Sequence, residues 1–349
     1  MNTKNKIIPI AFCFDKNYVI PASVAFYSLL ENSNKKYFYK FYVLHSDISE
    51  IQQKKLHDTI KPFKNICKLT FIDMNNKFAE LWKKNYNGGH FSKEVLYKLL
   101  LASIFHNYEK IIVSDVDVVF LGDISESYIK YDTNSNSYLA GVKTISKISN
   151  YYIDNYSKYW NENDIKIFSN ICGGYLVLNL KKIRNDNMEK KFMSFLEKNC
   201  NKLNQLEQDV LNMCCNKKIT YLPLEYVSCS YLWDYFKSDK DFNDEKKYSV
   251  NEIKHAMSHP IQLHYATSIK PWKNVNCTKS EEWFKYIVKT PFLNDFLNDL
   301  DSLLKITPKD KVQKNQKLTK IFFYIKRNPL FFVKKRFYQK LWKYFQKKN

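Results

Sequence analysis

The stretch Lys110–Asp123, with the sequence KIIVSDVDVVFLGD, constrains the fold of this chain more than any other. Its β-branched run Ile111–Val113 is typical of a strand that is buried on both faces. Asp115 and Asp117 follow this run, one residue apart, before apolar residues resume at Val118. Buried charge is costly unless it is paired or bound to a metal. The aspartates therefore indicate either a solvated strand end or a site for Mg²⁺ or Mn²⁺, which prefer oxygen ligands and often share a phosphate.

Composition places the chain among globular proteins with a strongly basic end. The length of 349 residues allows two medium domains or one large α/β domain with additions. Apolar residues make up 45% of the chain and aromatic residues 16%, which provides a sizeable core and excludes a mostly disordered protein. The formal charge of +21 is concentrated in residues 311–349, which contain 13 Lys or Arg and no acidic residue.

The cysteines and the N-terminal segment indicate the cellular compartment. The eight cysteines include no C-x-x-C pair, so the spacing of a zinc ribbon is absent. Scattered cysteines in apolar stretches suit free thiols in a reducing environment. The apolar run 7–14 is short, contains Pro9 and does not resemble a signal peptide. No stretch reaches the roughly 18 apolar residues of a membrane-spanning helix, and we therefore predict a cytoplasmic protein.

The first part of the chain alternates apolar runs with helical segments. The expected elements are a strand at 7–14, a helix over 21–32, a strand at 38–45, a helix over 50–61 and a strand at 69–72. This order predicts parallel strands covered by helices. Ligands bind at the carboxyl ends of such strands. Asp15 and Asp115 both follow predicted strands, so we expect them to share one crevice.

The middle of the chain carries further signals. A helix across 93–105 is expected to lead into the strand that bears the aspartates. The paired glycines Gly173 and Gly174 precede an apolar run, 176–180, and imply unusual backbone angles or the close approach of a ligand or another chain segment. Other expected elements are helices over 187–203, from Glu207 onward and over 280–304, and strands at 219–222 and 261–265.

Residues 225–260 mix aromatic and charged residues and give no clear assignment. Within them, His255 and His259 are four residues apart and can lie on one face of a helix. Because no third ligand is near them in the sequence, the pair is more typical of a protein surface than of a metal site.

Five landmarks in a fixed order resemble glycosyltransferase family 8, the retaining sugar-nucleotide transferases that include bacterial lipopolysaccharide galactosyl- and glucosyltransferases. The resemblance covers roughly residues 7–285. The landmarks are the first strand with Asp15–Tyr18, the D-x-D triplet Asp115–Asp117, Cys172–Gly174 before the apolar run, Glu207–Asp209, and His264 with Lys270–Trp272. The resemblance implies a GT-A fold, a mixed α/β sheet that binds a nucleotide sugar.

The resemblance also implies site residues. Asp115, Asp117 and His264 would bind Mn²⁺ or Mg²⁺, which would hold the diphosphate of a UDP-sugar donor. Gln208 and Asp209 would lie by the anomeric carbon and the sugar hydroxyls as the catalytic pair. The implied donor contacts are Cys13 beside the base, Asp15 on the uracil, Asn17, Val116 and Asp117 on the ribose, Lys270 on the phosphates, and Cys172 and Gly173 near the sugar, together with Lys98, Asp115 and His264.

The chain departs from the family pattern at Lys98, Cys172 and Glu207, and at Ala266 and Thr267, which replace the usual small turn before the lysine. Lys98 stands where the family usually has arginine, so it keeps the charge but loses the fork geometry. Cys172 stands where many relatives have asparagine, and Glu207 stands where aspartate is common. These departures surround the sugar and phosphate contacts, so the sequence leaves the transferred sugar open between galactose, glucose and other hexoses.

The basic tail has a chemistry of its own. Apolar residues recur there at helical spacing among lysines, as in helices that lie on anionic membranes. A solvated basic tail and nucleic-acid binding are the alternatives, and no nucleic-acid motif accompanies the lysines. We divide the chain into a GT-A catalytic domain at 1–280, helices packing on it at 281–310, and a membrane-associating tail at 311–349.

The sequence thus predicts a metal-dependent retaining hexosyltransferase, cytoplasmic and peripheral on the inner face of a bacterial inner membrane. Its partners would be a UDP-hexose and an oligosaccharide or lipid-linked glycan acceptor in lipopolysaccharide, lipooligosaccharide or other surface-glycan synthesis, with no nucleic acid. The alternatives are a non-catalytic nucleotide-sugar-binding relative and a basic membrane or nucleic-acid adaptor. For retention we prefer front-face transfer, in which the leaving phosphate oxygen takes the acceptor proton, over a carboxylate nucleophile.

Overall fold

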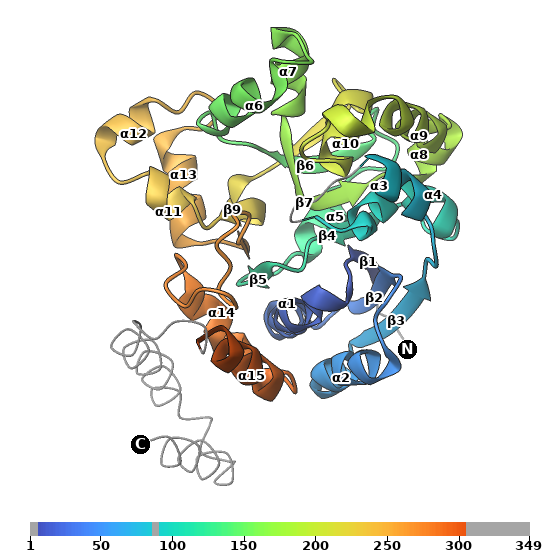
Figure 1. Ribbon diagram of the computed structural model, residues 1–349, viewed down its shortest axis with the longest axis vertical. Coiled ribbons are helices and arrows are strands. Elements are labelled where there is room, and N and C mark those ends of the chain that lie inside the picture. Colours follow the sequence, from blue (N-terminus) through green and yellow to red (C-terminus); the bar gives the residue numbers. More distant parts are fainter. Residues whose placement is uncertain (1–5, 86–90, 305–349) are drawn as a thin grey trace.

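The computed structural model describes residues 6–85 and 91–304 and contains two β-sheets (Figure 1). The larger sheet has seven strands in the order β3-β2-β1-β4-β7-β6-β8. Its strands are β1 (Ile7–Cys13), β2 (Phe38–His45), β3 (Cys67–Asp73), β4 (Ile111–Ser114), β6 (Leu139–Lys143), β7 (Ile171–Leu178) and β8 (Ile219–Leu222). Within the described residues, β7 alone runs opposite to the other strands of this sheet.

The N-terminal part confirms the predicted parallel β-α-β-α-β arrangement. Strand β1 pairs in parallel with β2 and with β4, and β2 pairs in parallel with β3. The connecting helices are α1 (Val19–Asn32) and α2 (Glu50–Ile60). Ser49 begins α2 with a capping box to Gln52, which satisfies backbone donors that the first turn would leave free.

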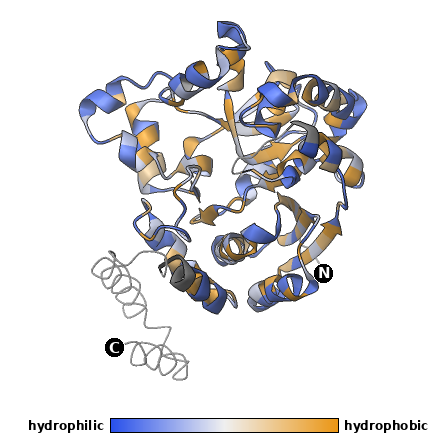
Figure 2. Ribbon diagram, in the orientation of Figure 1, coloured by the Kyte–Doolittle hydropathy of each residue, from blue (hydrophilic) through white to orange (hydrophobic). Residues whose placement is uncertain are grey.

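Both faces of the large sheet are buried. Ile10 and Phe12 of β1 belong to one hydrophobic cluster, and Ala11 and Cys13 between them belong to the other. Successive side chains of a strand point to opposite faces, so this alternation requires cover on both sides. Figure 2 shows hydrophobic residues along the central strands and more hydrophilic ones on the outer helices.

The smaller sheet begins where the D-x-D triplet ends. It contains β5 (Val118–Phe120), β9 (Ser228–Cys229) and β10 (Gln262–His264) in the order β5-β10-β9. The two apolar runs on either side of Asp115–Asp117 therefore belong to different sheets. The triplet is the link between them.

The helix predicted across 93–105 is wrong in type and extent. Residues Lys93–Leu100 form a 3₁₀ helix, followed by one α-helical turn, α4 (Leu101–Ile104). Such long 3₁₀ segments are uncommon because their hydrogen bonds are poorer. Here the tighter winding accompanies burial of the charged residues Glu94 and Lys98, which bond to side chains of other elements.

The glycine pair and most of the apolar run that follows it lie in one strand, β7, which begins at Ile171. The helix expected over 187–203 is confirmed as α9 (Met188–Asn199), which a short 3₁₀ turn, Cys200–Lys202, extends. The unassigned residues 225–260 contain β9 and three short helices, α11 (Leu232–Tyr235), α12 (Asp239–Asn243) and α13 (Val250–Ser258).

The remaining helices lie around the sheets (Figure 1). They are α3 (Ala79–Asn85), α5 (Ser125–Lys130), α6 (Ile148–Tyr156), α7 (Glu162–Phe168), α8 (Leu180–Asn185), α10 (Glu207–Cys214), α14 (Ser280–Ile287) and α15 (Leu293–Leu304). No helix among the described residues is both long and apolar enough to cross a bilayer. The proposed tail at 311–349 lies outside the described residues.

Candidate active site

The site is built where the two sheets meet. The backbone N–H of Asp115 donates to the carbonyl of Gly174 on β7 (3.1 Å), and the N–H of Tyr265 donates to the carbonyl of Asp117 (3.0 Å). His264 pairs with Val118 in the antiparallel register of β10 and β5. Main-chain hydrogen bonds thus fix both aspartates and the histidine, although the histidine lies far away in the sequence.

Asp115, Asp117 and His264 form a compact donor set. The Nε2 of His264 lies 3.2 Å from Oδ1 of Asp117 and 3.7 Å from Oδ2 of Asp115. One ligand atom from each residue lies within 4.8 Å of the other two. Two carboxylate oxygens and an imidazole nitrogen suit a divalent cation such as Mn²⁺. The residues therefore fit the metal that the sequence predicts.

Lys270 supplies the positive charge on the Asp117 side of this set. Its Nζ donates to Oδ2 of Asp117 and to the carbonyl of Tyr265, both at 2.6 Å. Burial by itself would raise the pKa of Asp117, but Lys270 and His264 outweigh burial and hold that pKa well below its usual value. Burial likewise opposes protonation of His264, while Asp117 and Cys172 raise the pKa of its ring to about 10.

Lys98 has a different environment on the Asp115 side. Its Nζ donates to Oδ1 of Asp115 (2.6 Å), to Oε1 of Glu207 (2.8 Å) and to the carbonyl of Gly173 (3.3 Å). The side chain is only 1% exposed. Burial disfavours its charge, but Asp115 and Glu207 raise its pKa above the ordinary lysine value. Lys98 is thus the counter-ion of two carboxylates, one from the D-x-D triplet and one from α10.

The glycine pair of β7 makes room for other side chains of the site. A Cβ on Gly174 would lie 2.5 Å from Cε1 and 2.6 Å from Nδ1 of the His264 ring. A Cβ on Gly173 would lie 3.3 Å from Cβ and Oε1 of Gln208. The sequence predicted unusual backbone angles or close approach of a ligand or segment. The structure shows the approach of another chain segment, since His264 packs against the backbone of Gly174.

Gln208 and Asp209 begin α10 but make different contacts. Gln208 Oε1 accepts from the N–H of Gly173 (2.6 Å), and its Nε2 donates to the hydroxyl of Tyr152 (2.5 Å). Asp209 is fully buried, and its Oδ2 accepts from the Tyr156 hydroxyl (2.5 Å) and from two backbone N–H groups. Burial raises the pKa of Asp209 to about 7. Both residues are thus bonded to helix α6, Gln208 also contacts the glycine strand, and Asp209 also accepts from the backbone that precedes α10.

The helix that carries this pair starts from a strained residue. Leu206 has φ of 45°, in a region that β-carbon-bearing residues rarely adopt. Such conformations cost free energy and persist only where surrounding contacts impose them. Leu206 is fully buried, so packing holds the conformation that directs Glu207 toward Lys98.

The residues predicted to contact the nucleoside follow β1. Asp15 accepts from the backbone N–H of Asn17 (3.0 Å) and from its side-chain amide (2.9 Å), so the two are bonded to each other. Tyr18 next to them packs edge-on against Trp272, with ring centroids 5.9 Å apart. Burial, then the charges of Asp117 and Asp15, raise the pKa of Tyr18. Strands β1 and β4 are parallel neighbours, so Asp15 and Asp115 lie at the same sheet edge.

Three other predicted residues are placed as follows. Cys13 is the last residue of β1 and is buried, and burial raises the pKa of its thiol although the charge of Lys98 acts to lower it. The side chain of Val116 packs in the hydrophobic core, so only its backbone is available to a ligand. Cys172 is half-buried in β7 next to Gly173. His255 and His259 stack on each other, with centroids 5.0 Å apart.

Several residues of the site were not predicted from the sequence. Tyr152 and Tyr156 of α6 bond Gln208 and Asp209 across more than 50 positions. Glu207 drew attention only as a departure from the family pattern, and its bond to Lys98 spans 109 positions. No local pattern signals such contacts. The spacing of Tyr152 and Tyr156, one helical turn apart, is the one available hint.

The site also concentrates unsatisfied polar atoms. Five buried side-chain polar atoms of the described residues have no hydrogen-bond partner, and three of them are at the site: Oε2 of Glu207, Oδ1 of Asp209 and Nδ1 of His264. Buried polar atoms are rarely left unpaired, so each one needs an explanation. Their grouping around one sheet edge is typical of a site that binds a polar ligand.

Comparison with known proteins identifies relatives of this chain. The model of the family described as "Glycosyl transferase family 8" matches residues 9–276. The chain is 23% identical over 292 residues to "General stress protein A" of Bacillus subtilis, covering 82% of this chain and 95% of the relative. It is 22% identical over 284 residues to "Lipopolysaccharide 1,2-glucosyltransferase" of Escherichia coli, covering 80% and 77%.

Solved structures share the fold. The bifunctional glycosyltransferase WbbM aligns with a TM-score of 0.69 and 20% identity over 85% of this chain, which spans only 52% of that longer protein. The galactosyltransferase LgtC, solved with donor and acceptor sugar analogues, aligns with a TM-score of 0.62 and 17% identity, covering 81% of this chain and 96% of LgtC. At these identities the likeness establishes the GT-A fold.

Proposed function

The chain belongs to glycosyl transferase family 8 and is a glycosyltransferase, and on this premise we propose that it moves galactose or glucose from a UDP-sugar to a glycan hydroxyl with retention. The observation that carries the proposal is the donor set of Asp115, Asp117 and His264 with Lys270 beside it. A divalent ion in this set would neutralise charge on the departing nucleoside diphosphate.

Lys270 is the residue best suited to the donor phosphates. An ammonium has three donor protons, and within the described residues two are used, by Asp117 and by the Tyr265 carbonyl. The third is available to a phosphate oxygen. Lys98 has three acceptors already, so in this proposal it keeps Asp115 and Glu207 in place.

The nucleoside would bind at the end of β1. Asp15 would accept from the uracil, and Asn17 would reach the ribose together with Asp117 and the backbone of Val116. Cys13 would flank the base. The bond between Asp15 and the Asn17 amide holds both side chains in a fixed orientation before a ligand arrives, which reduces the entropy lost on binding.

The sugar would lie between the β7 glycines and the start of α10. Gln208 is fixed there by Gly173 and Tyr152, so its amide is positioned to contact the anomeric centre. Cys172 would lie near the sugar hydroxyls. Asp209 would hold the start of α10, and with it Gln208, in place through its hydrogen bonds to Tyr156 and the preceding backbone.

Asp209 is poorly suited to act as a nucleophile. Its Oδ2 accepts three hydrogen bonds, Oδ1 is buried, and the pKa of about 7 leaves it partly protonated at neutral pH. An amide such as Gln208 is a weak nucleophile. Front-face transfer therefore suits this site better, with the leaving phosphate oxygen taking the proton of the acceptor hydroxyl and no covalent sugar on the enzyme.

The biological role proposed is synthesis of lipopolysaccharide or another bacterial surface glycan. The E. coli relative is named as a lipopolysaccharide glucosyltransferase, which supports this proposal. An oligosaccharide or lipid-linked acceptor would be met at the inner face of the membrane, with residues 1–280 as the catalytic domain, 281–310 as helices packed on it and 311–349 as the membrane-associating tail.

The proposal is tested by donor turnover. Purified protein is incubated with Mn²⁺ and a panel of UDP-sugars, and released UDP is measured. We expect release with one hexose donor and its loss, by a factor of about 1,000 or more, in the double variant Asp115→Ala/Asp117→Ala, because removal of a charge-stabilising group costs two to three orders of magnitude on its own.

The chain offers a matched control for that variant. Asp239 and Asp241 form another D-x-D spacing in the first turn of α12, where Asp239 is exposed and Asp241 is partly exposed. The double change Asp239→Ala/Asp241→Ala should leave UDP release unchanged. Equal loss in both double variants, or equal activity in both, would reject the site assignment.

The tail is tested separately. Deletion of residues 311–349 should release the protein from vesicles containing anionic phospholipid and spare UDP release, because each basic residue near such a surface contributes about 1 kcal/mol. Sedimentation with vesicles of neutral and anionic composition measures the effect. Equal vesicle binding with and without the tail would contradict the proposal.

A further inference from the structure

A second group of metal-ligand atoms lies beside the donor set. Cys172 of β7, Cys229 of β9 and His264 of β10 each offer one ligand atom, and these atoms lie within 4.8 Å of one another. Three strands thus bring together two thiols and an imidazole that are widely separated in the sequence. Among the described residues, the possible metal-binding groups are this one and the D-x-D set, and both include His264.

The two thiols and the imidazole lie largely inside the protein. Cys229 is 3% and His264 4% exposed, while Cys172 is half-buried. The Nδ1 of His264 is buried with no hydrogen-bond partner. Cys172 and Cys229 also line a cavity of about 10 Å³, which has room for roughly one water-sized occupant.

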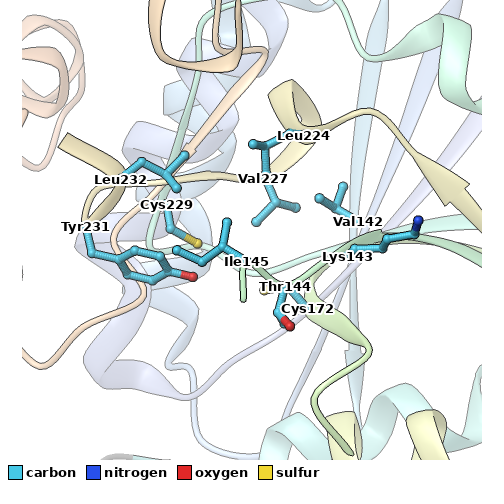
Figure 3. Close-up of a pocket in the computed structure, with 10 residues that line it drawn as sticks. All are labelled: Val142, Lys143, Thr144, Ile145, Cys172, Leu224, Val227, Cys229, Tyr231 and Leu232. Carbon is cyan, nitrogen blue, oxygen red and sulfur yellow. The ribbon is translucent and has the colours of Figure 1, made fainter. Parts of the chain in front are cut away.

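Figure 3 shows which other groups border that cavity. The Cys229 sulfur and the Tyr231 hydroxyl lie near each other, Thr144 lies next to Cys172, and Lys143 extends away. The Nζ of Lys143 is 4.3 Å from the centre of the Tyr221 ring, so its charge is used elsewhere. Apolar side chains complete the lining. Apart from Lys143, no lysine or arginine side chain of the described residues belongs to the cavity lining.

The D-x-D set and the thiol group prefer different metal ions. Carboxylates prefer hard cations such as Mn²⁺ and Mg²⁺, whereas thiolates prefer Zn²⁺ and softer ions. We propose that Cys172, Cys229 and His264 form a binding site for Zn²⁺, adjacent to the D-x-D set, with a water molecule as the fourth ligand. Binding releases the protons of the two thiols and the second ring proton of His264 to solvent as the Zn–S and Zn–N bonds form.

Sharing of His264 makes the two sites compete. A neutral imidazole offers one lone pair, so it ligates one metal at a time. Zn²⁺ bound to the thiols withdraws the histidine from Asp115 and Asp117, and the donor metal then loses one of its three protein ligands. This consequence rests on the proposed function, whereas the thiol site itself does not.

The site is tested by metal binding without any donor. The full chain, reduced with a phosphine, is titrated with Zn²⁺ against a chromophoric chelator, and Co²⁺ is substituted to observe thiolate-to-cobalt absorption in the near ultraviolet. We expect one Zn²⁺ per chain and a sulfur band with Co²⁺. Cys172→Ser and Cys229→Ser should each weaken Zn²⁺ binding by about 100-fold or more and reduce the band, because each removes a ligand.

Cys214→Ser is the matched control, since Cys214 is a half-buried free cysteine outside the group. It should bind Zn²⁺ as the unmodified chain does. If Cys229→Ser fails to fold, the half-buried Cys172→Ser carries the test. Zn²⁺ affinity unchanged in the Cys172→Ser chain, or a Co²⁺ complex without a sulfur band, would overturn the site. Simultaneous binding of one Zn²⁺ and one Mn²⁺ would overturn the competition. Because these readouts need no turnover, their failure is distinguishable from failure of the proposed function.

Discussion

The two aspartates of the D-x-D triplet are held by two lysines in unlike settings. Lys98 bonds Asp115, Glu207 and a backbone carbonyl, which uses all three of its donor protons. Lys270 bonds Asp117 and one carbonyl, which leaves a proton available within the described part of the chain. One lysine is therefore committed to the protein, and the other remains able to bind a ligand.

The partners of the two lysines strengthen this contrast. Both lysine side chains are buried, with Lys98 1% and Lys270 6% exposed. Glu207, which is 6% exposed, has Lys98 as its ion-pair partner, whereas Asp117 has His264 as a further partner. A buried charge whose partner is removed is strongly destabilising. The Lys98 side should therefore respond to substitution mainly through stability, and the Lys270 side mainly through ligand binding.

The largest effect is expected from Lys98→Met. The change leaves Glu207 buried without its counter-ion and should lower the free energy of unfolding by about 3–5 kcal/mol. Lys270→Met is the matched variant and should lower it by about 1–3 kcal/mol, because Asp117 keeps His264 as a partner. Urea denaturation followed by circular dichroism measures both. A larger loss of unfolding free energy in Lys270→Met than in Lys98→Met would contradict the assigned roles of the two lysines.

The next effect concerns the space beside His264. Gly174→Ala places a methyl group 2.5 Å from a ring atom of His264 and should destabilise the fold by about 1–3 kcal/mol through overpacking. Gly173→Ala meets Gln208 at 3.3 Å and should cost less. Thermal unfolding of both variants, with Mn²⁺ binding as a second readout, tests the difference. Equal shifts in melting temperature would show that the histidine moves freely.

Ligand binding should rank the two lysine variants in the opposite order to stability. Lys270→Met should weaken UDP binding in the presence of Mn²⁺ by about 10- to 100-fold, since loss of a charged hydrogen bond is worth roughly 1.5–3 kcal/mol. Folded Lys98→Met should weaken it less. Calorimetric titration at a temperature where both variants are folded provides the measurement. A weaker UDP affinity in Lys98→Met would contradict the assignment.

The smallest expected effect is the pH dependence due to Asp209. Its pKa is about 7 in the folded chain, above the ordinary value of 3.8, so between these pH values the folded state binds more protons than the unfolded state. Stability from this group therefore falls as pH rises from about 4 to 7. Asp209→Asn removes the titration, so the stability difference between the two proteins should change by at least about 1 kcal/mol over that window.

Parallel urea titrations at pH 4.5 and pH 7 measure that change, and groups common to both proteins cancel. Tyr156→Phe, which keeps the carboxyl group but removes its hydrogen-bond donor, is the companion variant and should retain the pH dependence. A constant difference between the unmodified chain and Asp209→Asn would show that Asp209 titrates normally.

The sequence predicted best where local signals decide the structure. The strand before Asp115 and the helix expected over 50–61 depend on signals within a few residues, and both elements formed as expected. The 3₁₀ form of Lys93–Leu100 was missed because it accompanies the burial of Lys98 against Glu207, a contact made across 109 positions. A helical pattern alone does not contain that information.

The site shows the same division. The order of the motifs predicted that His264 and the D-x-D aspartates belong to one site. In the structure the His264 Nε2 lies 3.2–3.7 Å from carboxylate oxygens of Asp117 and Asp115. The sequence did not indicate that Cys229 lies beside Cys172, because the two are joined through the pairing of β9 with β10. The secondary structure of residues 225–260 could not be assigned from the sequence because the helices and strands there are too short to show a hydrophobic periodicity.

The central claim is that Asp115, Asp117 and His264 bind the metal that holds the donor. Free Mn²⁺ is followed by electron paramagnetic resonance as protein is titrated in the presence of UDP. The account predicts one Mn²⁺ bound per chain, retained in Asp239→Ala/Asp241→Ala and lost in Asp115→Ala/Asp117→Ala. Undiminished Mn²⁺ binding by the Asp115→Ala/Asp117→Ala chain, shown to be folded, would contradict it.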